Sequence, residues 1–194
     1  MSSVRRRGYA GDAADDADRE CRVNASRATN GDIPALQRLI EQSARSLSVG
    51  YYTPAQIDAV VRYVFGVDST LIDDGTYFVV RDGDEIVACG GWSQRRTLYG
   101  GDQRPVGASD LLDPAKDAAR IRAFFVAPSH ARRGIGRMLL DACVVPAKTA
   151  GFRRLELMAT LPGVPFYRRL GFETADTGVS EIGPWVRYRA PAGS

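Results

Sequence analysis

One stretch in the second half of the chain restricts the fold more than any other. It runs from Phe124 to Leu140 and reads FFVAPSHARRGIGRMLL. The apolar run before Pro128 predicts a strand and the apolar spacing after Gly134 predicts a helix, so a basic turn joins a strand to a helix N-terminus. The unpaired N–H groups and the dipole of such an N-terminus favour an anion, most naturally a phosphate or pyrophosphate.

The composition of this turn also suits an anionic ligand. Gly134 and Gly136 have no Cβ, which lets a ligand approach the backbone closely. Charge-assisted donors are available from Arg132, Arg133 and Arg137. The third glycine of a dinucleotide-binding fingerprint and the Gly-Lys-Ser/Thr of a P-loop are both missing, so these two motifs are excluded.

The rest of the chain alternates between predicted helices and strands. Alternating apolar residues from Cys21 to Ser26 indicate a strand, and Asp32 is the predicted N-cap of a helix. A second helix is expected at Thr53-Pro54-Ala55-Gln56, which has capping-box spacing. The other expected elements are a hairpin over 76–81 and 85–89, a strand over 120–126, a helix over 134–150, a strand over 155–159, a short helix over 164–170, and strands over 172–174 and 185–188.

Length and composition indicate one soluble domain. The chain has 194 residues, of which 44% are hydrophobic and 25% charged, which is enough for one sizeable core. Residues 1–20 contain almost nothing apolar and are predicted to be a disordered tail, which leaves 21–194 as the domain. No apolar run approaches the roughly 18 residues of a membrane span, and the N-terminus lacks the apolar core of a signal peptide, so we expect a cytoplasmic protein that binds no membrane.

Charge and cysteine content argue against several other classes. The formal net charge of +3 is well short of a nucleic-acid footprint, and an acidic run follows the arginine triplet at 5–7. The three cysteines, Cys21, Cys89 and Cys143, are widely spaced, and the chain has one histidine. We therefore expect neither a disulfide framework nor a metal site.

A second motif follows the strand predicted over 155–159. Residues 163–172 read GVPFYRRLGF. With it the chain resembles the GNAT superfamily of acetyl-CoA-dependent N-acetyltransferases, whose pattern is a strand ending in Val-x-Pro, an Arg-Arg-Gly-Ile-Gly-type turn, a long helix, a strand, and a short helix with Phe-Tyr-x-x-x-Gly-Phe. The resemblance extends from about Cys21 to Tyr188. Ala131 departs from the pattern, because the family usually has Gln or Arg there; CoA binding would then depend more on backbone amides.

The resemblance implies both a fold and a cosubstrate. The fold would be a single α/β domain with a mixed, mostly antiparallel twisted sheet, flanked by helices and splayed between the fourth and fifth strands. The cosubstrate would be acetyl-CoA, with no metal. Its pantetheine arm would pair with the fourth strand near Phe124 and Val126. Its pyrophosphate would lie on the turn made by Arg132, Arg133, Gly134, Ile135, Gly136 and Arg137.

The resemblance also implies direct attack of an amine on the acetyl thioester. A backbone N–H near Val126 would stabilise the oxyanion. Tyr167 would protonate the departing CoA thiolate as general acid. The alternative for Tyr167 is a helix tyrosine packed under the sheet.

The general base is open. Arg120 stands where some members of the family have a glutamate. This leaves Glu85, Asp117 or Glu156 acting through ordered water, or an acceptor amine of lower pKa. His130 titrates in a useful range, but its position before the anion site predicts a loop residue.

The acceptor would be recognised by the loop between the first two helices and by the segment over 94–117, a candidate flap. Tyr51 and Tyr52 would form an aromatic wall, with packing against the second helix as the alternative. Arg120 and Arg122 share one face of their strand by period-two alternation. If that face lines the cleft, it favours a substrate with a carboxylate or phosphate; otherwise the two form a salt-bridged strand edge.

Three functions remain. The first is an N-acetyltransferase acting on a small-molecule primary amine. The second is a CoA-binding module without turnover, suggested by Ala131 and the missing glutamate. The third is a nucleic-acid binder acting through the arginines at 5–7. Members of this family often dimerise, so a homodimer is an alternative to a monomer.

Overall fold

The computed structural model describes residues 24–99, 101–102, 110–180 and 183–192. The predicted tail over 1–20, its arginines and Cys21 lie outside these residues, as does part of the 94–117 segment. In the described part of the chain, no helix is long and apolar enough to cross a membrane.

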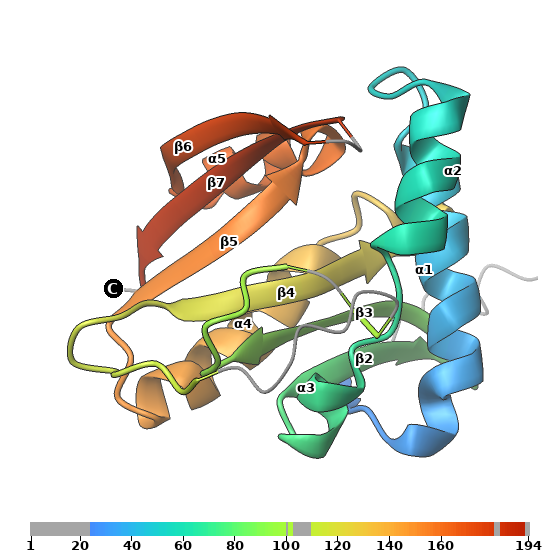
Figure 1. Cartoon of the computed structure of the whole chain (residues 1–194). Helices are drawn as coiled ribbons and strands as arrows, with labels where there is room; N and C mark the ends of the chain where they lie inside the picture. The colour runs from blue at the N-terminus through green and yellow to red at the C-terminus, as the bar shows by residue number, and fades with distance from the viewer. Residues whose placement is uncertain (1–23, 100, 103–109, 181–182, 193–194) are drawn as a thin grey trace, which may run out of the picture.

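A twisted sheet of seven strands forms the centre of the molecule (Figure 1), in the order β1-β2-β3-β4-β5-β7-β6. Only β4 and β5 pair in parallel, and the other neighbours are antiparallel. The expected mixed, mostly antiparallel α/β fold is therefore confirmed. The strands are β1 (Ala25–Arg27), β2 (Tyr77–Asp82), β3 (Glu85–Ser93), β4 (Ala119–Val126), β5 (Arg154–Thr160), β6 (Glu173–Ser180) and β7 (Gly183–Pro191).

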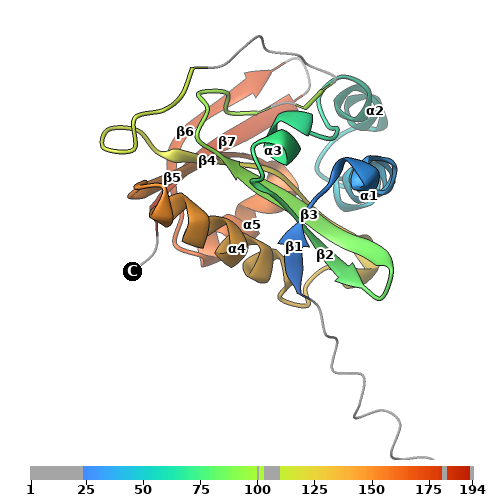
Figure 2. The same cartoon turned by 90° about the horizontal axis from the view of Figure 1, so that it is seen from below.

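Helices cover both faces of this sheet. Figure 2 shows α4 against one face and α1 and α3 against the other. The helices are α1 (Ile33–Leu47), α2 (Pro54–Tyr63), α3 (Ser69–Asp73), α4 (Ile135–Thr149) and α5 (Val164–Arg169), with short 3-10 helices η1 (Asn30–Asp32), η2 (Pro128–His130) and η3 (Leu161–Gly163).

Local sequence signals explain where these elements begin. The Thr53 hydroxyl accepts a hydrogen bond from the Gln56 amide, and the Gln56 side chain accepts one from the Thr53 amide, so the expected capping box starts α2. Gly83, with φ +60°, forms the turn of the β2–β3 hairpin. Asp32 precedes α1 as expected, but its carboxylate makes no cap bond to that helix. It accepts instead from the Thr29 amide and from Arg81.

Helix α3 and strands β6 and β7 differ from expectation. The sequence did not predict helix α3. It has only five residues, too few to show helical spacing, and it has no side-chain cap bond. Strands β6 and β7 are longer than the predicted 172–174 and 185–188. The sequence of β6 is polar and contains glycine, so it does not show the pattern of a strand. Pairing with β7 from Glu173 to Ser180 stabilises the strand instead.

Two clusters of buried side chains form the core. One packs α1 and the amino-terminal part of α4 on β2 and β3, around Leu36, Val79 and Leu139. The other packs the rest of α4 and α5 on β5 and β7, around Cys143 and Tyr188. Helix α4 belongs to both clusters and therefore ties the two halves of the sheet together.

The two halves separate between β4 and β5. These strands pair only over Ala119–Ile121 and Leu155–Leu157, and their carboxyl ends diverge (Figure 1). The expected splay of the sheet is confirmed. It leaves the β5-facing edge of β4 without a strand partner beyond Ile121 among the described residues.

Candidate functional site

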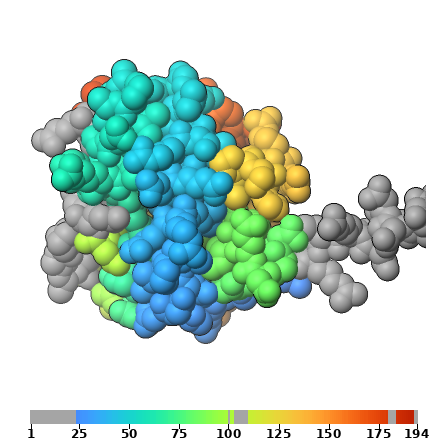
Figure 3. Space-filling model, turned by 90° about the vertical axis from the view of Figure 1, so that its right-hand side faces the viewer, coloured from blue at the N-terminus to red at the C-terminus, as the bar shows by residue number. Residues whose placement is uncertain are grey.

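A cavity of about 820 Å³ opens where β4 and β5 diverge. One side of its lining comes from β4, from Ile121 to Val126, and the other from β5, from Met158 to Thr160. The turn after β4, the end of α1, the start of α2 and helix α5 complete it. Figure 3 shows the segment after β4, in yellow, beside α1 at the surface. The splay therefore creates a cavity to which many of the predicted site residues contribute.

A bulge in β4 shapes the floor of this cavity. Ala123 has φ +54°, and the register between β3 and β4 shifts beside it. The Tyr77 hydroxyl lies 3.5 Å from the Ala123 carbonyl oxygen and 3.3 Å from the Cys89 sulfur. A Cβ at Gly90 would lie 2.4 Å from the Phe124 ring, so only glycine fits beneath that ring. The bulge thus fixes how Phe124 and Val126 line the cavity.

Cys89 is a structural residue in this arrangement. Burial raises the pKa of its thiol to about 12, so the sulfur stays protonated at neutral pH. Cys89 and Cys143 are both buried and unbridged. The described residues contain no group of three or more His, Cys, Asp or Glu side chains that could hold a metal ion.

The turn before α4 presents unpaired amides to the cavity. Arg132 and Gly134 have φ values of +68° and +83°. The amides of Arg137 and Met138 donate to the Gly134 carbonyl, but within the described structure no backbone bond is donated by residues 132–136. Backbone N–H groups arranged in this way form an anion-binding concavity at a helix N-terminus.

The side chains of this turn differ in what they can contribute. Arg132 and Arg133 are exposed and form no ion pair within the described part of the chain. The Arg137 guanidinium already pairs with Asp141 at 3.0 Å. Packing against Phe166 explains why residue 136 is a glycine, because a Cβ there would lie 3.1 Å from the Phe166 ring. The sequence did not indicate this contact.

Tyr167 lies on α5 with its ring buried and its residue in the cavity lining. Edge-to-face contacts with Phe166 and Phe172 hold the ring, at centroid distances of 5.0 and 5.5 Å. Burial raises the pKa of the Tyr167 hydroxyl, with a smaller contribution from Cys143. The hydroxyl is therefore protonated throughout the physiological range.

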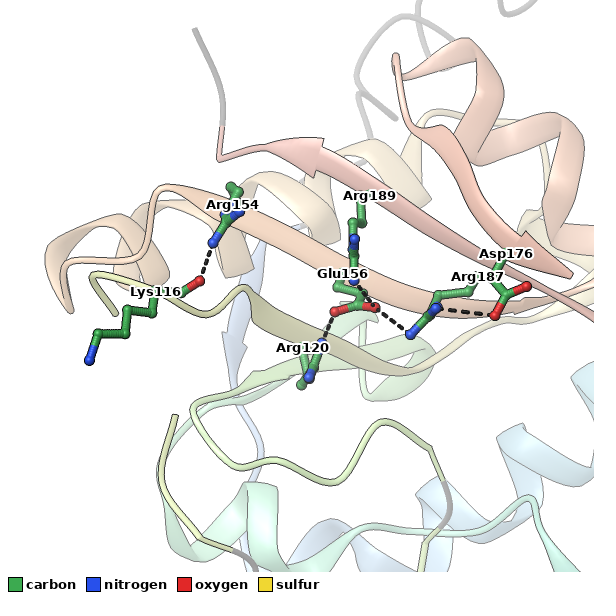
Figure 4. Close-up of polar contacts among 7 residues, drawn as sticks. All are labelled: Lys116, Arg120, Arg154, Glu156, Asp176, Arg187 and Arg189. Atoms are coloured by element: carbon green, nitrogen blue, oxygen red, sulfur yellow. Dashed lines mark hydrogen bonds and ion pairs between the residues drawn. The ribbon is translucent and has the colours of Figure 1, made fainter. Parts of the chain in front are cut away.

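The two arginines of β4 are both engaged in ion pairs. Arg122 lines the cavity, but its side chain is only 6% exposed and pairs with Asp68 at 2.7 Å. Arg120 does not line the cavity and pairs with Glu156. Figure 4 shows Glu156 between Arg120 and the two β7 arginines, Arg187 and Arg189. Arg122, but not Arg120, therefore lies at the cavity, and both side chains are salt-bridged.

The two tyrosines of the α1–α2 loop have different positions. Tyr52 is partly buried, donates a hydrogen bond to the Pro184 carbonyl at 3.0 Å and accepts one from the Leu161 amide at 2.9 Å. Burial raises the pKa of its hydroxyl. Tyr51 is 49% exposed and also lines the cavity. Tyr52 therefore joins the α1–α2 loop to the far half of the sheet, while Tyr51 presents a ring to the cavity.

The candidate bases are not brought to the site. Glu85, Asp117 and Glu156 all lie outside the cavity lining, and no described Asp or Glu belongs to it. His130 lies in η2 in the connection after β4, lines the cavity and contacts Asp82 at 3.1 Å.

Sequence reasoning missed several residues of the cavity. Phe65, Met158 and Trp185 line it, and Asp68 supports Arg122 from behind. Each lies in a loop or strand far from the turn in sequence, and long-range pairing brings them together. The single available signal was the alternation along 154–160, which places Met158 on the face opposite the buried Leu157.

Comparisons with known proteins agree with this architecture. Residues 38–172 match the model of the Acetyltransferase (GNAT) family. Similar solved structures include a GCN5-related N-acetyltransferase from Rhodopseudomonas palustris, which is 16% identical over 86% of this chain and 94% of that chain, with a TM-score of 0.63. PaiA N-acetyltransferase from Thermoplasma acidophilum, in complex with coenzyme A, is 12% identical over 87% of this chain and 99% of that chain, with a TM-score of 0.61.

The ribosomal-protein-S18-alanine N-acetyltransferase from Escherichia coli is 16% identical over 89% of this chain and 95% of that chain, with a TM-score of 0.53. At these identities the likeness shows the fold. A comparison with curated proteins found no match.

Proposed function

Because the chain belongs to the acetyltransferase (GNAT) family, we propose that it transfers an acetyl group from acetyl-CoA to the nitrogen of a small primary amine. One observation carries the proposal: Arg132, Gly134 and Gly136, whose amides are unpaired, line the same cavity as the buried Tyr167, whereas Arg133 and Ile135 of the turn do not line it. An anion site and a protonated hydroxyl at one cavity are what acetyl transfer from a phosphate-bearing thioester requires.

The residues present fit acetyl-CoA. The turn offers backbone amides for a pyrophosphate, with Arg132 and Arg133 as mobile cationic donors. The unpartnered edge of β4 near Phe124 and Val126 offers N–H and C=O groups to the amide-containing pantetheine arm. The absence of a long side chain at Ala131 leaves this binding to the backbone, as the sequence predicts.

In the proposed reaction the amine nitrogen attacks the acetyl carbon, the C–S bond breaks, and Tyr167 gives its proton to the sulfur. The nitrogen then loses one proton to water, and Tyr167 regains one, so the products are the acetamide and CoA thiol. An N–H of the β4 end stabilises the oxyanion formed on the way. A tyrosine of raised pKa is a weak acid, but the same burial disfavours a thiolate, as the Cys89 thiol shows. A CoA sulfur held in similarly buried surroundings would also have a raised pKa, which favours the proton transfer.

Two measurements test the proposal. Saturating acetyl-CoA should raise the thermal midpoint by a few degrees, since a ligand at 100 times its Kd adds about 2.7 kcal/mol. Release of CoA thiol in the presence of a panel of primary amines should then show turnover. Absence of both would contradict the proposal.

Substitution of Tyr167 tests the assignment of the general acid. Tyr167→Phe should lower kcat about 100-fold or more and leave acetyl-CoA binding intact, because only the proton donor is removed. Tyr188→Phe is the matched control, since its ring lies 6.3 Å from that of Tyr167 but it does not line the cavity. Equal activity of the two variants would overturn the assignment.

A CoA-binding module without turnover is the second candidate. The observation that favours it is the lack of a described carboxylate in the cavity lining. An acetyl-CoA-dependent thermal shift without thiol release from any amine would select it.

A further inference from the structure

The cavity is unsuited to a charged amine. Its described lining contains the basic side chains Arg122, His130, Arg132, Arg137 and Arg169, and no Asp or Glu. Arg122, His130 and Arg137 are paired with Asp68, Asp82 and Asp141, but Arg132 and Arg169 have no acidic partner among the described residues. The lining therefore has an excess of positive charge, which suits the phosphates of CoA and opposes the approach of an ammonium group.

An aliphatic amine would therefore be presented in the wrong protonation state. With a pKa near 10.4, only about one molecule in 2,500 of a lysine-type amine is neutral at pH 7. Other enzymes can use a carboxylate to attract the ammonium and accept its proton. Here Glu156 is only 4% exposed, lies outside the lining and is held by Arg120, Arg187 and Arg189.

The wall available to an acceptor is apolar and partly aromatic. We define the acceptor wall as Leu47, Tyr51, Val64, Phe65, Met158 and Trp185, six of the large apolar and aromatic lining residues that belong neither to the turn nor to β4. The Phe65 ring is fixed edge-to-face against Phe125 at 5.3 Å. Rings and aliphatic side chains in such a wall favour a flat apolar ligand over a polar chain.

Resting on the proposed acetyl transfer, we propose that the acceptor is an apolar aromatic amine whose nitrogen is uncharged at neutral pH, of the arylamine class. Its nitrogen carries a free lone pair and needs no base before it attacks. The N–C bond forms and the C–S bond breaks, and Tyr167 protonates the sulfur. After attack the nitrogen is acidic enough to lose its proton to water, and that proton restores Tyr167. The products are an N-aryl acetamide and CoA.

Two isomeric amines test the inference directly. 4-Ethylaniline and 2-phenylethylamine contain the same atoms, but at neutral pH the first is uncharged and the second is an ammonium. At pH 7, kcat/KM measured by thiol release should be at least about tenfold higher for 4-ethylaniline. Its profile should also be flat between pH 6.5 and 8.5, whereas that of 2-phenylethylamine should rise about tenfold per pH unit.

A designed carboxylate supplies the second test. Leu47→Glu places a carboxylate in the acceptor wall at a position that is 36% exposed, so folding is retained. This variant should shift the ratio of the two kcat/KM values about tenfold toward 2-phenylethylamine. Val145→Glu, which adds the same charge at a 66% exposed position on α4 outside the cavity, should leave the ratio unchanged.

The outcomes separate this inference from the proposed function. Preference for 2-phenylethylamine would overturn the arylamine assignment, show that the aromatic wall holds an ammonium, and leave acetyl transfer standing. Thiol release with other amines but not with 4-ethylaniline would also overturn the assignment alone. No thermal shift with acetyl-CoA and no thiol release with any amine would overturn both.

Discussion

Glu156 is a buried carboxylate with a structural task. Its side chain is paired with Arg120 and lies 3.4 Å from both Arg187 and Arg189, on three neighbouring strands. A carboxylate surrounded in this way neutralises the arginines of β4 and β7. Its oxygens are occupied, which explains why the glutamate that the sequence left open as a base does not reach the cavity.

Removal of this charge should weaken the fold and leave the chemistry intact. Glu156→Gln should lower the free energy of unfolding by about 3 kcal/mol, because the nearly buried guanidinium group of Arg120 loses its counter-charge. Urea denaturation measures the effect. Asp176→Asn, which removes the 51% exposed partner of Arg187, should cost less than about 1 kcal/mol. A Glu156→Gln protein of normal stability but without turnover would show instead that Glu156 is the base.

Single residues were predictable from sequence where the signal is local. Tyr167 and the glycines of the turn follow from short motifs, and the structure places them at one cavity. The partners of Arg122 and Arg120 were not predictable, because Asp68 and Glu156 meet them only through tertiary packing and strand pairing.

The turn between β4 and α4 depends on one glycine. Gly134 has φ +83° with no atom within 4 Å of the Cβ position, so a side chain there meets backbone strain and no clash. Gly83 in the β2–β3 hairpin has φ +60° and the same open space, far from the cavity.

Alanine substitutions at Gly134 and Gly83 separate the effect of backbone strain from the effect on ligand binding. Gly134→Ala and Gly83→Ala should each lower the free energy of unfolding by about 1 kcal/mol, because alanine resists positive φ. Only Gly134→Ala should weaken acetyl-CoA binding, by about tenfold in a calorimetric titration. Equal affinity in both variants would mean that the turn does not hold the cosubstrate.

The contribution of Asp32, just before α1, to the free energy of unfolding should depend on pH. Burial acts to raise the pKa of Asp32, but hydrogen bonds from Thr29 and Arg81 outweigh it and hold the pKa below its ordinary value of 3.8. The stabilisation is therefore present above that value and is lost as the pH falls through the range below it. Asp32→Asn should cost about 1 kcal/mol at pH 7 and less at pH 3.5.

Denaturant unfolding at the two pH values checks this expectation. Asp84→Asn, at an exposed residue of the hairpin turn, serves as the control and should show no such dependence. A cost for Asp32→Asn that is the same at both pH values would contradict the role of the ionised carboxylate.

Most elements were predictable because the spacing of apolar residues agrees with the sequence signals that mark where helices and turns begin. Helices α1, α2 and α4 combine helical spacing with start signals, and β2 and β3 combine β-rich runs with a glycine turn. Helix α3 and most of β6 were missed, because one is too short to show a period and the other depends on its pairing with β7.

At the scale of the whole molecule, Tyr52 bridges the opening between the two halves of the sheet. Its hydroxyl contacts Pro184 and Leu161, both in the half that contains β5 and β7. Tyr52→Phe should lower the free energy of unfolding by about 1–2 kcal/mol, because the Leu161 amide and the Pro184 carbonyl each lose a partner.

Hydrogen exchange locates the effect. The Leu161 amide should exchange faster in Tyr52→Phe than in the unaltered protein. Tyr51→Phe is the matched control, since Tyr51 is 49% exposed and its hydroxyl makes no hydrogen bond within the described structure. Unchanged protection of Leu161 in Tyr52→Phe would show that the bridge contributes nothing to closure.

The separation of β4 from β5 also has a consequence for self-association of the protein. Beyond Ile121 the N–H and C=O groups on one edge of β4 have no strand partner within the described residues. Such an edge is a template on which another extended chain can add, including a second copy of this protein. A ligand that occupies this edge of β4 would block such self-association. Under the proposed function, acetyl-CoA would be such a ligand.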